Sequence, residues 1–319
     1  MEKRRGRSWV RVGVRAPAYL RAARETTHAR CHPPVTPGRP VTPGRPVALM
    51  ETSRPSRLQP IAALLRPLLA RPAAVVEGIG AYSILIFRAF NLPRDISPKL
   101  YTRNTLTQMV QVGIDSIPIV ALATAFTGGV VVVQAIYQLE NPLLPASLVG
   151  TFAEQSILLE LGTLVTAFVL CGRVGARVAA ELGTMRVKEQ IDALEAMGIA
   201  SLSYLVVPRV VAGVLMFPVL YVISATVGML SGLAVAELSP VLSSGLYWDG
   251  ARAFFKVYDV FFGLVKSLVF GFAITSVACY TGYNARGGAE GVGEATTRAA
   301  VLGCVSVLIA DYVCAALLL

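Results

Sequence analysis

Long apolar runs separated by short polar stretches dominate residues 114–319. A helix needs about 20 mainly apolar residues to cross a bilayer. We therefore predict five membrane spans, at about residues 114–139, 150–171, 202–236, 260–283 and 297–319. The third is long enough to be tilted or to extend past the bilayer. The pattern predicts an all-α, polytopic membrane protein.

Residues 73–92 form a further apolar stretch with a different pattern. The apolar residues recur at helical spacing, whereas Glu77 and Arg88 interrupt the remainder. This is typical of a helix that lies in the membrane interface with one face in lipid. An imperfect sixth span is the competing interpretation.

The segment between the second and third spans is charged, and its pattern predicts a short amphipathic helix at about residues 184–198. Thr184 is suited to cap its first turn and Gly198 to end it. Lys188 and Asp192 have the spacing of an i,i+4 ion pair. The apolar side chains of one face are Val187, Ile191, Leu194 and Met197.

Two interpretations of this helix stay open. It either lies solvated on the bilayer or docks with a protein. Helices that bind lipid prefer a basic polar face, whereas the polar face here is mixed and slightly acidic. The pattern favours a protein partner.

Composition supports the membrane assignment and gives an orientation. Charged residues make up 15% of the chain and the mean hydropathy is +0.62, whereas soluble domains have about 25% charged residues. The loops after spans two and four carry basic residues, and the loops at 140–149 and 238–251 carry none. Because basic loops stay in the cytoplasm, the N-terminus is predicted to be cytoplasmic and the C-terminus to lie outside.

The net charge of +10 belongs to residues 1–66, which hold fourteen Arg or Lys and three acids. This tail contains the repeat VTPGRPVTPGRP (Val35–Pro46), and such Pro and Gly density predicts disorder. Three interpretations stay open: attraction to nucleic acid or anionic lipid, an organellar transit peptide, or a misassigned start with Met50 as the initiator. The rest of the chain is nearly neutral, and we expect no nucleic-acid partner.

The sequence lacks the residues that several kinds of enzymatic reaction need. The only histidines, His28 and His32, lie in the tail, which argues against Ser–His–Asp hydrolysis and His-ligated zinc in the membrane part. No G-x-x-x-x-G-K-[ST] sequence occurs, so the chain has no P-loop for ATP. The glycines of GGAEGVG (Gly287–Gly293) are expected to form a flexible turn before span five. We expect no catalytic, metal or cofactor site.

Ionisable residues within spans are costly, so they pair or mark a transport path. Four stand out, namely Glu160, Asp259, Lys266 and Asp311. Lys266 is the one basic residue of this set and the natural partner for one or more of the acids. Two interpretations stay open: the charges tie helices together, or some of them meet a phospholipid headgroup in a cavity.

Three long stretches, in this order and spacing, resemble the MlaE-type (YrbE-type) permeases of ABC lipid transporters. The resemblance covers roughly residues 72–319. The three stretches are AELGTMRVKEQIDALEAMGI (Ala180–Ile199), DVFFGLVKSLVFG (Asp259–Gly271) and GVGEATTRAAV (Gly291–Val301).

The resemblance implies a bacterial inner-membrane permease that works as a homodimer with a separate ABC ATPase, which binds the ATP and Mg²⁺. It also implies a periplasmic MCE-domain partner and phospholipid or a related lipid as cargo. The helix at 184–198 would be the coupling helix, which sits in a groove of the ATPase. The residues assigned to this contact are Glu181, Arg186, Lys188, Glu189, Asp192, Leu194 and Glu195.

Relatives in this family carry acids and a lysine at the four intramembrane positions, with proposed roles in the transport cavity. They often have Arg before the span-two Glu and Pro shortly after it, where this chain has Leu159 and Thr163. TGGVVVVQ (Thr127–Gln134) has adjacent glycines, where helices can approach closely, and a branched aliphatic run. We expect spans one and five to be the cavity walls, and ordinary helix packing, which uses the same residue types, is the other interpretation.

Two rival functions remain. An ion-coupled secondary transporter would use Glu160, Asp259 and Asp311 as a proton relay, although the inverted repeats common in such transporters are not evident. An intramembrane enzyme acting on lipid is the other, and the missing histidines argue against it.

Overall fold

The computed structural model describes residues 77–91, 98–138, 145–240 and 242–318. The basic tail and the start of the predicted interfacial helix lie outside these residues. All regular elements among them are helices, and five are long and apolar enough to cross a membrane. The prediction of an all-α protein with five spans is confirmed. The five are Tyr101–Gln138, Leu148–Val187, Ser201–Leu238, Val257–Tyr283 and Gly288–Leu318.

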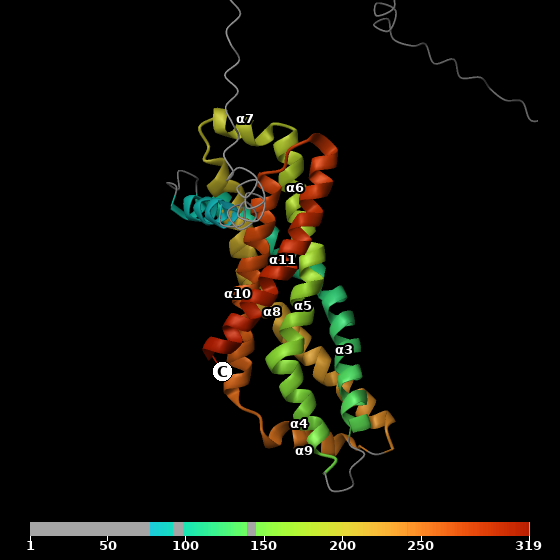
Figure 1. The fold of residues 1–319 in the computed structure, drawn as a ribbon. Helices are drawn as coiled ribbons and strands as arrows, with labels where there is room; N and C mark the ends of the chain where they lie inside the picture. Colours follow the sequence, from blue (N-terminus) through green and yellow to red (C-terminus); the bar gives the residue numbers. More distant parts are fainter. Residues whose placement is uncertain (1–76, 92–97, 139–144, 241, 319) are drawn as a thin grey trace, which may run out of the picture. The chain divides into compact units, whose positions relative to one another are not determined.

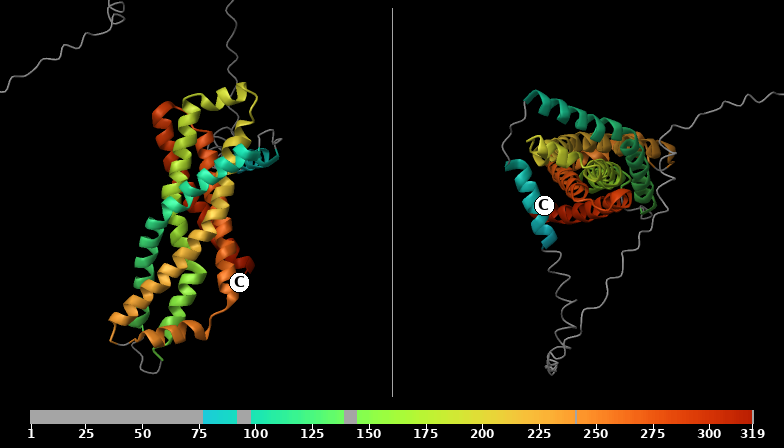
Figure 2. Two further views of the ribbon diagram at one scale, coloured as in Figure 1. Left: turned by 180° about the vertical axis from the view of Figure 1, so that it is seen from behind. Right: turned by 90° about the horizontal axis from the view of Figure 1, so that it is seen from above.

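The first span is longer than predicted because α2 (Pro98–Val112) precedes α3 (Ile117–Gln138), with the short helical turn η3 (Ile114–Ser116) between them. The chain bends between α2 and α3 (Figure 2). Polar residues dilute the apolar pattern of α2, which is why the sequence did not predict it. Two of them, Thr105 and Gln108, are buried, and α2 packs against α8 (Ser201–Leu238).

The second span continues sixteen residues beyond its predicted end. It runs as α4 (Leu148–Gln155), η4 (Ser156–Leu161), α5 (Gly162–Leu170), η5 (Cys171–Gly175) and α6 (Ala176–Val187). Forty helical residues extend about 60 Å, roughly twice the thickness of a hydrocarbon core. This helix therefore projects beyond the bilayer.

The short helix α7 (Gln190–Ala196) follows α6, so the predicted start of an amphipathic helix at Thr184 is wrong. Thr184 lies inside α6, and the break occurs at Glu189, whose φ of 56° is left-handed. The predicted end is confirmed, since Gly198 has a φ of 78°. Its N–H donates to the Glu195 carbonyl and the Ile199 N–H to the Leu194 carbonyl, which is a Schellman motif.

Two further differences concern the connections. Residues between spans three and four include a helix, α9 (Ser244–Ala253), which the sequence did not predict. Glycines predicted to be a flexible turn mostly belong to α11 (Gly288–Leu318). Only Gly287 and Gly288 have left-handed φ values there, 95° and 72°, and they turn the chain after α10 (Val257–Tyr283).

Residues 77–91 form a helix that lies across the long helices instead of along them (Figure 1). The Ser203 hydroxyl of α8 donates to the Ala89 carbonyl at 2.7 Å. Tyr82 shares a 2.6 Å hydrogen bond with Ser276 of α10, and burial raises its pKa. This orientation agrees with the predicted interfacial helix, while its lipid contact stays a prediction.

Glycines let helices approach closely at several points in the bundle. A Cβ on Gly128 of α3 would lie 2.2 Å from the Gly228 carbonyl oxygen of α8. Gly150 of α4 is as tightly placed, because a Cβ there would lie 2.0 Å from the Tyr247 carbonyl oxygen of α9. Side chains at these positions would force backbone segments apart.

We predict that Gly128→Ala lowers the free energy of unfolding by about 1–3 kcal/mol, the usual range for overpacking. Thermal unfolding in detergent measures this. Gly293→Ala in α11 is the matched control, since a Cβ there meets nothing within 4 Å and alanine favours helix. Equal stability of the two variants would contradict the close α3–α8 packing.

Candidate functional site

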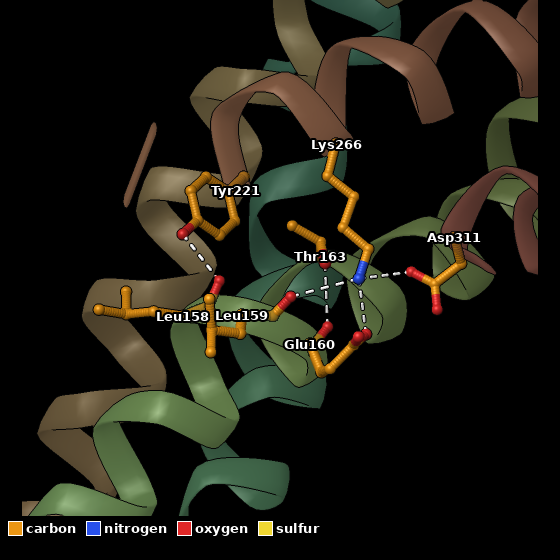
Figure 3. Close-up of polar contacts among 7 residues, drawn as sticks. All are labelled: Leu158, Leu159, Glu160, Thr163, Tyr221, Lys266 and Asp311. Carbon is orange, nitrogen blue, oxygen red and sulfur yellow. Dashed lines mark hydrogen bonds and ion pairs between the residues drawn. The ribbon is translucent and has the colours of Figure 1, made fainter. Parts of the chain in front are cut away.

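The Lys266 side chain is fully buried at the centre of a three-helix charge cluster (Figure 3). Its ammonium nitrogen lies 2.6 Å from Glu160 Oε2 and 2.5 Å from Asp311 Oδ1. It also donates to the Leu159 carbonyl at 3.2 Å. Three of the four predicted intramembrane charges thus meet, from η4, α10 and α11.

The element η4 is a π-helical turn, and it positions the Leu159 carbonyl and the Glu160 carboxylate that contact Lys266. Such a turn interrupts the regular i to i−4 bonding and often occurs at functional sites. Around η4, the Tyr221 hydroxyl donates to the Leu158 carbonyl at 3.0 Å, and the Thr163 hydroxyl to the Glu160 carbonyl at 2.9 Å. Side chains and Lys266 therefore satisfy carbonyls of the widened turn.

The two carboxylates differ in exposure, and this difference decides what each can reach. Side-chain exposure is 43% for Glu160 and 19% for Asp311, against 0% for Lys266. The aromatic rings of Phe262 and Phe270 also face the ammonium, with centroids at 5.3 and 6.0 Å. The Lys266 ammonium is enclosed by its partners in this arrangement, whereas the Glu160 carboxylate has exposed surface.

Asp259, the fourth predicted residue, does not join this cluster. It lies at the start of α10, is 7% exposed, and is within electrostatic reach of Glu154 on α4. Glu154 is a candidate that the sequence reasoning missed, although it is an acid within the predicted second span. It borders a cavity of about 580 Å³ formed by η4, α8, α9 and α10.

At the end of the bundle far from α9, α7 is fixed to its neighbours (Figure 1). Ile191 is fully buried in the main hydrophobic core. The Glu195 carboxylate accepts from Ser201 at 2.5 Å and from Tyr283 at 3.2 Å. These contacts join α7 to the first turn of α8 and the last turn of α10.

The predicted ATPase-contact residues divide into internal and outward-facing groups. Glu181 pairs with Arg177 and Arg209, and the half-buried Leu194 packs on the core. Asp192 pairs with Arg186 at 2.6 Å, which corrects the predicted Lys188–Asp192 pair: the break at Glu189 puts Lys188 outside α7 and off its helical register.

Lys188 and Glu189 are both exposed and have no ion-pair partner within the described part of the chain. Met197, predicted to join the apolar face, is 67% exposed. The surface of α7 that remains open therefore combines charged side chains with one large apolar side chain.

The sequence profile of the family described as Permease MlaE matches residues 105–317. The chain belongs to the MlaE permease family. A probable ABC transporter permease protein of Rickettsia bellii is 37% identical over 242 residues, which cover 76% of this chain and 92% of the relative. The intermembrane phospholipid transport system permease protein MlaE of Haemophilus influenzae is 33% identical over 212 residues, 66% of this chain and 81% of the relative.

One similar protein comes from a plant. The chloroplastic protein TRIGALACTOSYLDIACYLGLYCEROL 1 of Arabidopsis thaliana is 36% identical over 220 residues. These residues cover 69% of this chain and 63% of the plant protein. The MlaE-family chain described here is thus a multi-pass membrane protein and a transport component.

The resemblance predicts Arg and Pro where this MlaE-family chain has Leu159 and Thr163. Leu159 contributes its carbonyl to Lys266, and the Thr163 hydroxyl bonds the Glu160 carbonyl. Lys266 supplies the positive charge for Glu160 from another helix. Glu160 consequently has a cationic partner without the arginine, and shares it with Asp311.

We predict that Lys266→Met lowers the free energy of unfolding by about 3–5 kcal/mol, because two carboxylates lose their buried cation. Thermal unfolding of the detergent-solubilised permease measures the loss. The triple variant Lys266→Met, Glu160→Gln, Asp311→Asn removes all the charge and should recover most of the stability. A single variant as stable as wild type would show that the cluster does not tie the helices.

Proposed function

We propose that this chain is the membrane-spanning subunit of an ATP-driven transporter that moves phospholipid or a related lipid. The observation on which this proposal rests is the family match over residues 105–317. Similarity to a relative named for intermembrane phospholipid transport supports lipid as the cargo. ATP and Mg²⁺ bind a separate ABC ATPase, and a periplasmic MCE-domain protein exchanges lipid at the outer face. The transporter breaks no bond in the lipid.

The contacts of α7 support a role as the coupling helix. Tyr283 touches Glu195 of α7, and Lys266 lies seventeen residues earlier on the same helix, α10. Seventeen helical residues span about 25 Å. An ATPase that moves α7 would therefore move the charge cluster through one rigid helix.

The span that contains α6 provides a second connection. It carries Glu160 and ends beside α7 without leaving helical conformation. Displacement of α7 thus acts at once on two of the three charged residues of the cluster, Lys266 and Glu160. This arrangement supports a gate that opens or closes when nucleotide binds the ATPase.

The distribution of exposed apolar surface supports a homodimer with lipid between its halves. In the most apolar 18-residue stretch of each span, 33% of the residues are buried in span one and 17% in span five. The corresponding share is 50% in each of the other three spans. Exposed aromatic residues include Phe126 on α3 and Tyr312 on α11. Spans one and five are accordingly the walls that would face the second copy and the cargo.

The proposed orientation puts α7 in the cytoplasm and α9 at the periplasmic face of the inner membrane. The α7 end bears Arg173, Arg177, Arg186 and Lys188, together with Arg286 and Arg298. The segment between α8 and α10 carries Arg252 and Lys256, which lie just beyond the loop bounds predicted from the sequence. The excess of basic residues still favours a cytoplasmic α7 end.

We expect Lys188→Glu to weaken co-purification of the ATPase by roughly tenfold, since reversing an interfacial charge creates repulsion. Affinity purification followed by quantitation of both chains measures this. Lys256→Glu, a reversal of an exposed lysine at the opposite end, is the matched control and should retain the ATPase. Equal retention in both variants would argue against docking through this part of the chain.

An ion-coupled transporter that uses Glu160 and Asp311 is the rival, and the partial exposure of Glu160 keeps it relevant. Lipid transfer from proteoliposomes containing the permease and its ATPase separates the two. We expect transfer to stop when ATP is replaced by a non-hydrolysable analogue and to continue after a protonophore collapses the proton gradient. The reverse pattern would favour ion coupling.

A further inference from the structure

Glu154 is a buried acid whose role the Lys266 cluster does not explain. It is 2% exposed, and neither carboxylate oxygen has a hydrogen-bond partner among the described residues. A buried carboxylate without partners is strongly disfavoured, and within membrane spans such groups mark functional positions. Its side chain borders the 580 Å³ cavity, so a bound ligand could supply the missing partner.

Most of the cavity wall is apolar. Leu158 and Val260 lie near Glu154, and the helices α8 and α9 contribute the remainder. Leu230 and Phe255 are 53% and 47% exposed, so the cavity opens at the outer surface of the bundle. Its volume falls in the range of small-molecule sites, with room for a polar headgroup and the first part of an acyl chain.

No basic side chain of the described residues forms an ion pair with Glu154. Asp259, also buried, is within electrostatic reach of Glu154, and neither acid has an ion-pair partner in the described part of the chain. Lys266 is committed to Glu160 and Asp311. Glu154, a buried acid on the cavity lining without a basic partner among the described residues, favours a ligand that carries a positive charge.

Arg252 gives the same cavity a positive charge on its lining. It is exposed at the end of α9, and its guanidinium lies over the Trp248 ring, 5.9 Å from the centroid. Both side chains line the cavity. Arginine in such a position is suited to bind phosphate. The lining of the cavity therefore includes a buried acid, an exposed arginine and mainly apolar side chains.

We propose that this cavity binds a zwitterionic phospholipid, with the ammonium at Glu154, the phosphate at Arg252 and the acyl chain along the apolar wall. The proposal rests on the proposed function, because it names the headgroup that the permease prefers. An anionic phospholipid offers Arg252 the same phosphate but leaves Glu154 unpaired. The permease therefore discriminates against it.

The experiment compares retention of two lipids by the purified full-length protein. Wild type and variants are incubated in detergent micelles with equal amounts of phosphatidylethanolamine and phosphatidylglycerol, and bound lipid is counted by native mass spectrometry. Wild type should retain phosphatidylethanolamine in excess. Glu154→Gln should reduce that excess by about tenfold, as expected for loss of one charge-assisted contact.

Two variants keep the outcome specific. Glu237→Gln changes an exposed acid near the same end of the bundle and should bind both lipids as wild type does. Arg252→Gln should weaken both lipids alike, because both carry phosphate. Thermal unfolding should show Glu154→Gln to be at least as stable as wild type, since it removes an unpaired charge.

A wild type without headgroup preference would overturn the proposal, as would a Glu154→Gln variant with unchanged preference or with equal loss of both lipids. A different result would overturn the proposed function: proteoliposomes with the wild-type permease and its ATPase would transfer neither lipid when ATP is supplied. If ATP-dependent transfer proceeds but Glu154→Gln leaves the lipid preference unchanged, the proposed permease function stands and the ammonium site at Glu154 is rejected.

Discussion

The buried ammonium of Lys266 is the interaction around which the centre of this bundle is arranged. A lysine without exposed surface requires acceptors for its ammonium, and here they come from two other helices. Two carboxylates and one backbone carbonyl meet that need, while two aromatic rings cover the remainder. Spans two, four and five are consequently held in one relative register.

The need for acceptors around the Lys266 ammonium also explains the role of η4. The π-helical turn interrupts the regular i to i−4 bonding, and the Leu159 carbonyl within it accepts from the lysine. This turn lies in the middle of a helix that extends past the bilayer to α7. The gate at the cluster and the contact surface at α7 are thus parts of one continuous element, and coupling between them requires no additional mechanism.

Much of this arrangement follows from residue patterns, and the rest depends on tertiary contacts. Apolar runs predicted all five spans, and charge balance predicted that Lys266 would pair with acids. The sequence pattern could not show that Asp259 lies outside the cluster. Lys266 and Asp259 share a helix, and only the fold decides which neighbours each of them meets. The π-helical turn at Ser156–Leu161 has no local sequence marker either.

Other differences have equally specific causes. Helix α2 was missed because buried polar residues, among them Gln108, lower its apolar content. The break before α7 falls at Glu189 in a left-handed conformation, which side-chain propensities do not favour, so Thr184 was the more plausible cap. Glu154 could have been found, since the rule that selected Glu160 applies equally to an acid six residues earlier.

The most direct test of the central claim is native mass spectrometry of the protein purified gently from its own membrane. The account predicts two copies of this chain with two ATPase chains and retained phospholipid. A single chain without ATPase or lipid, under conditions that preserve other membrane complexes, would contradict it.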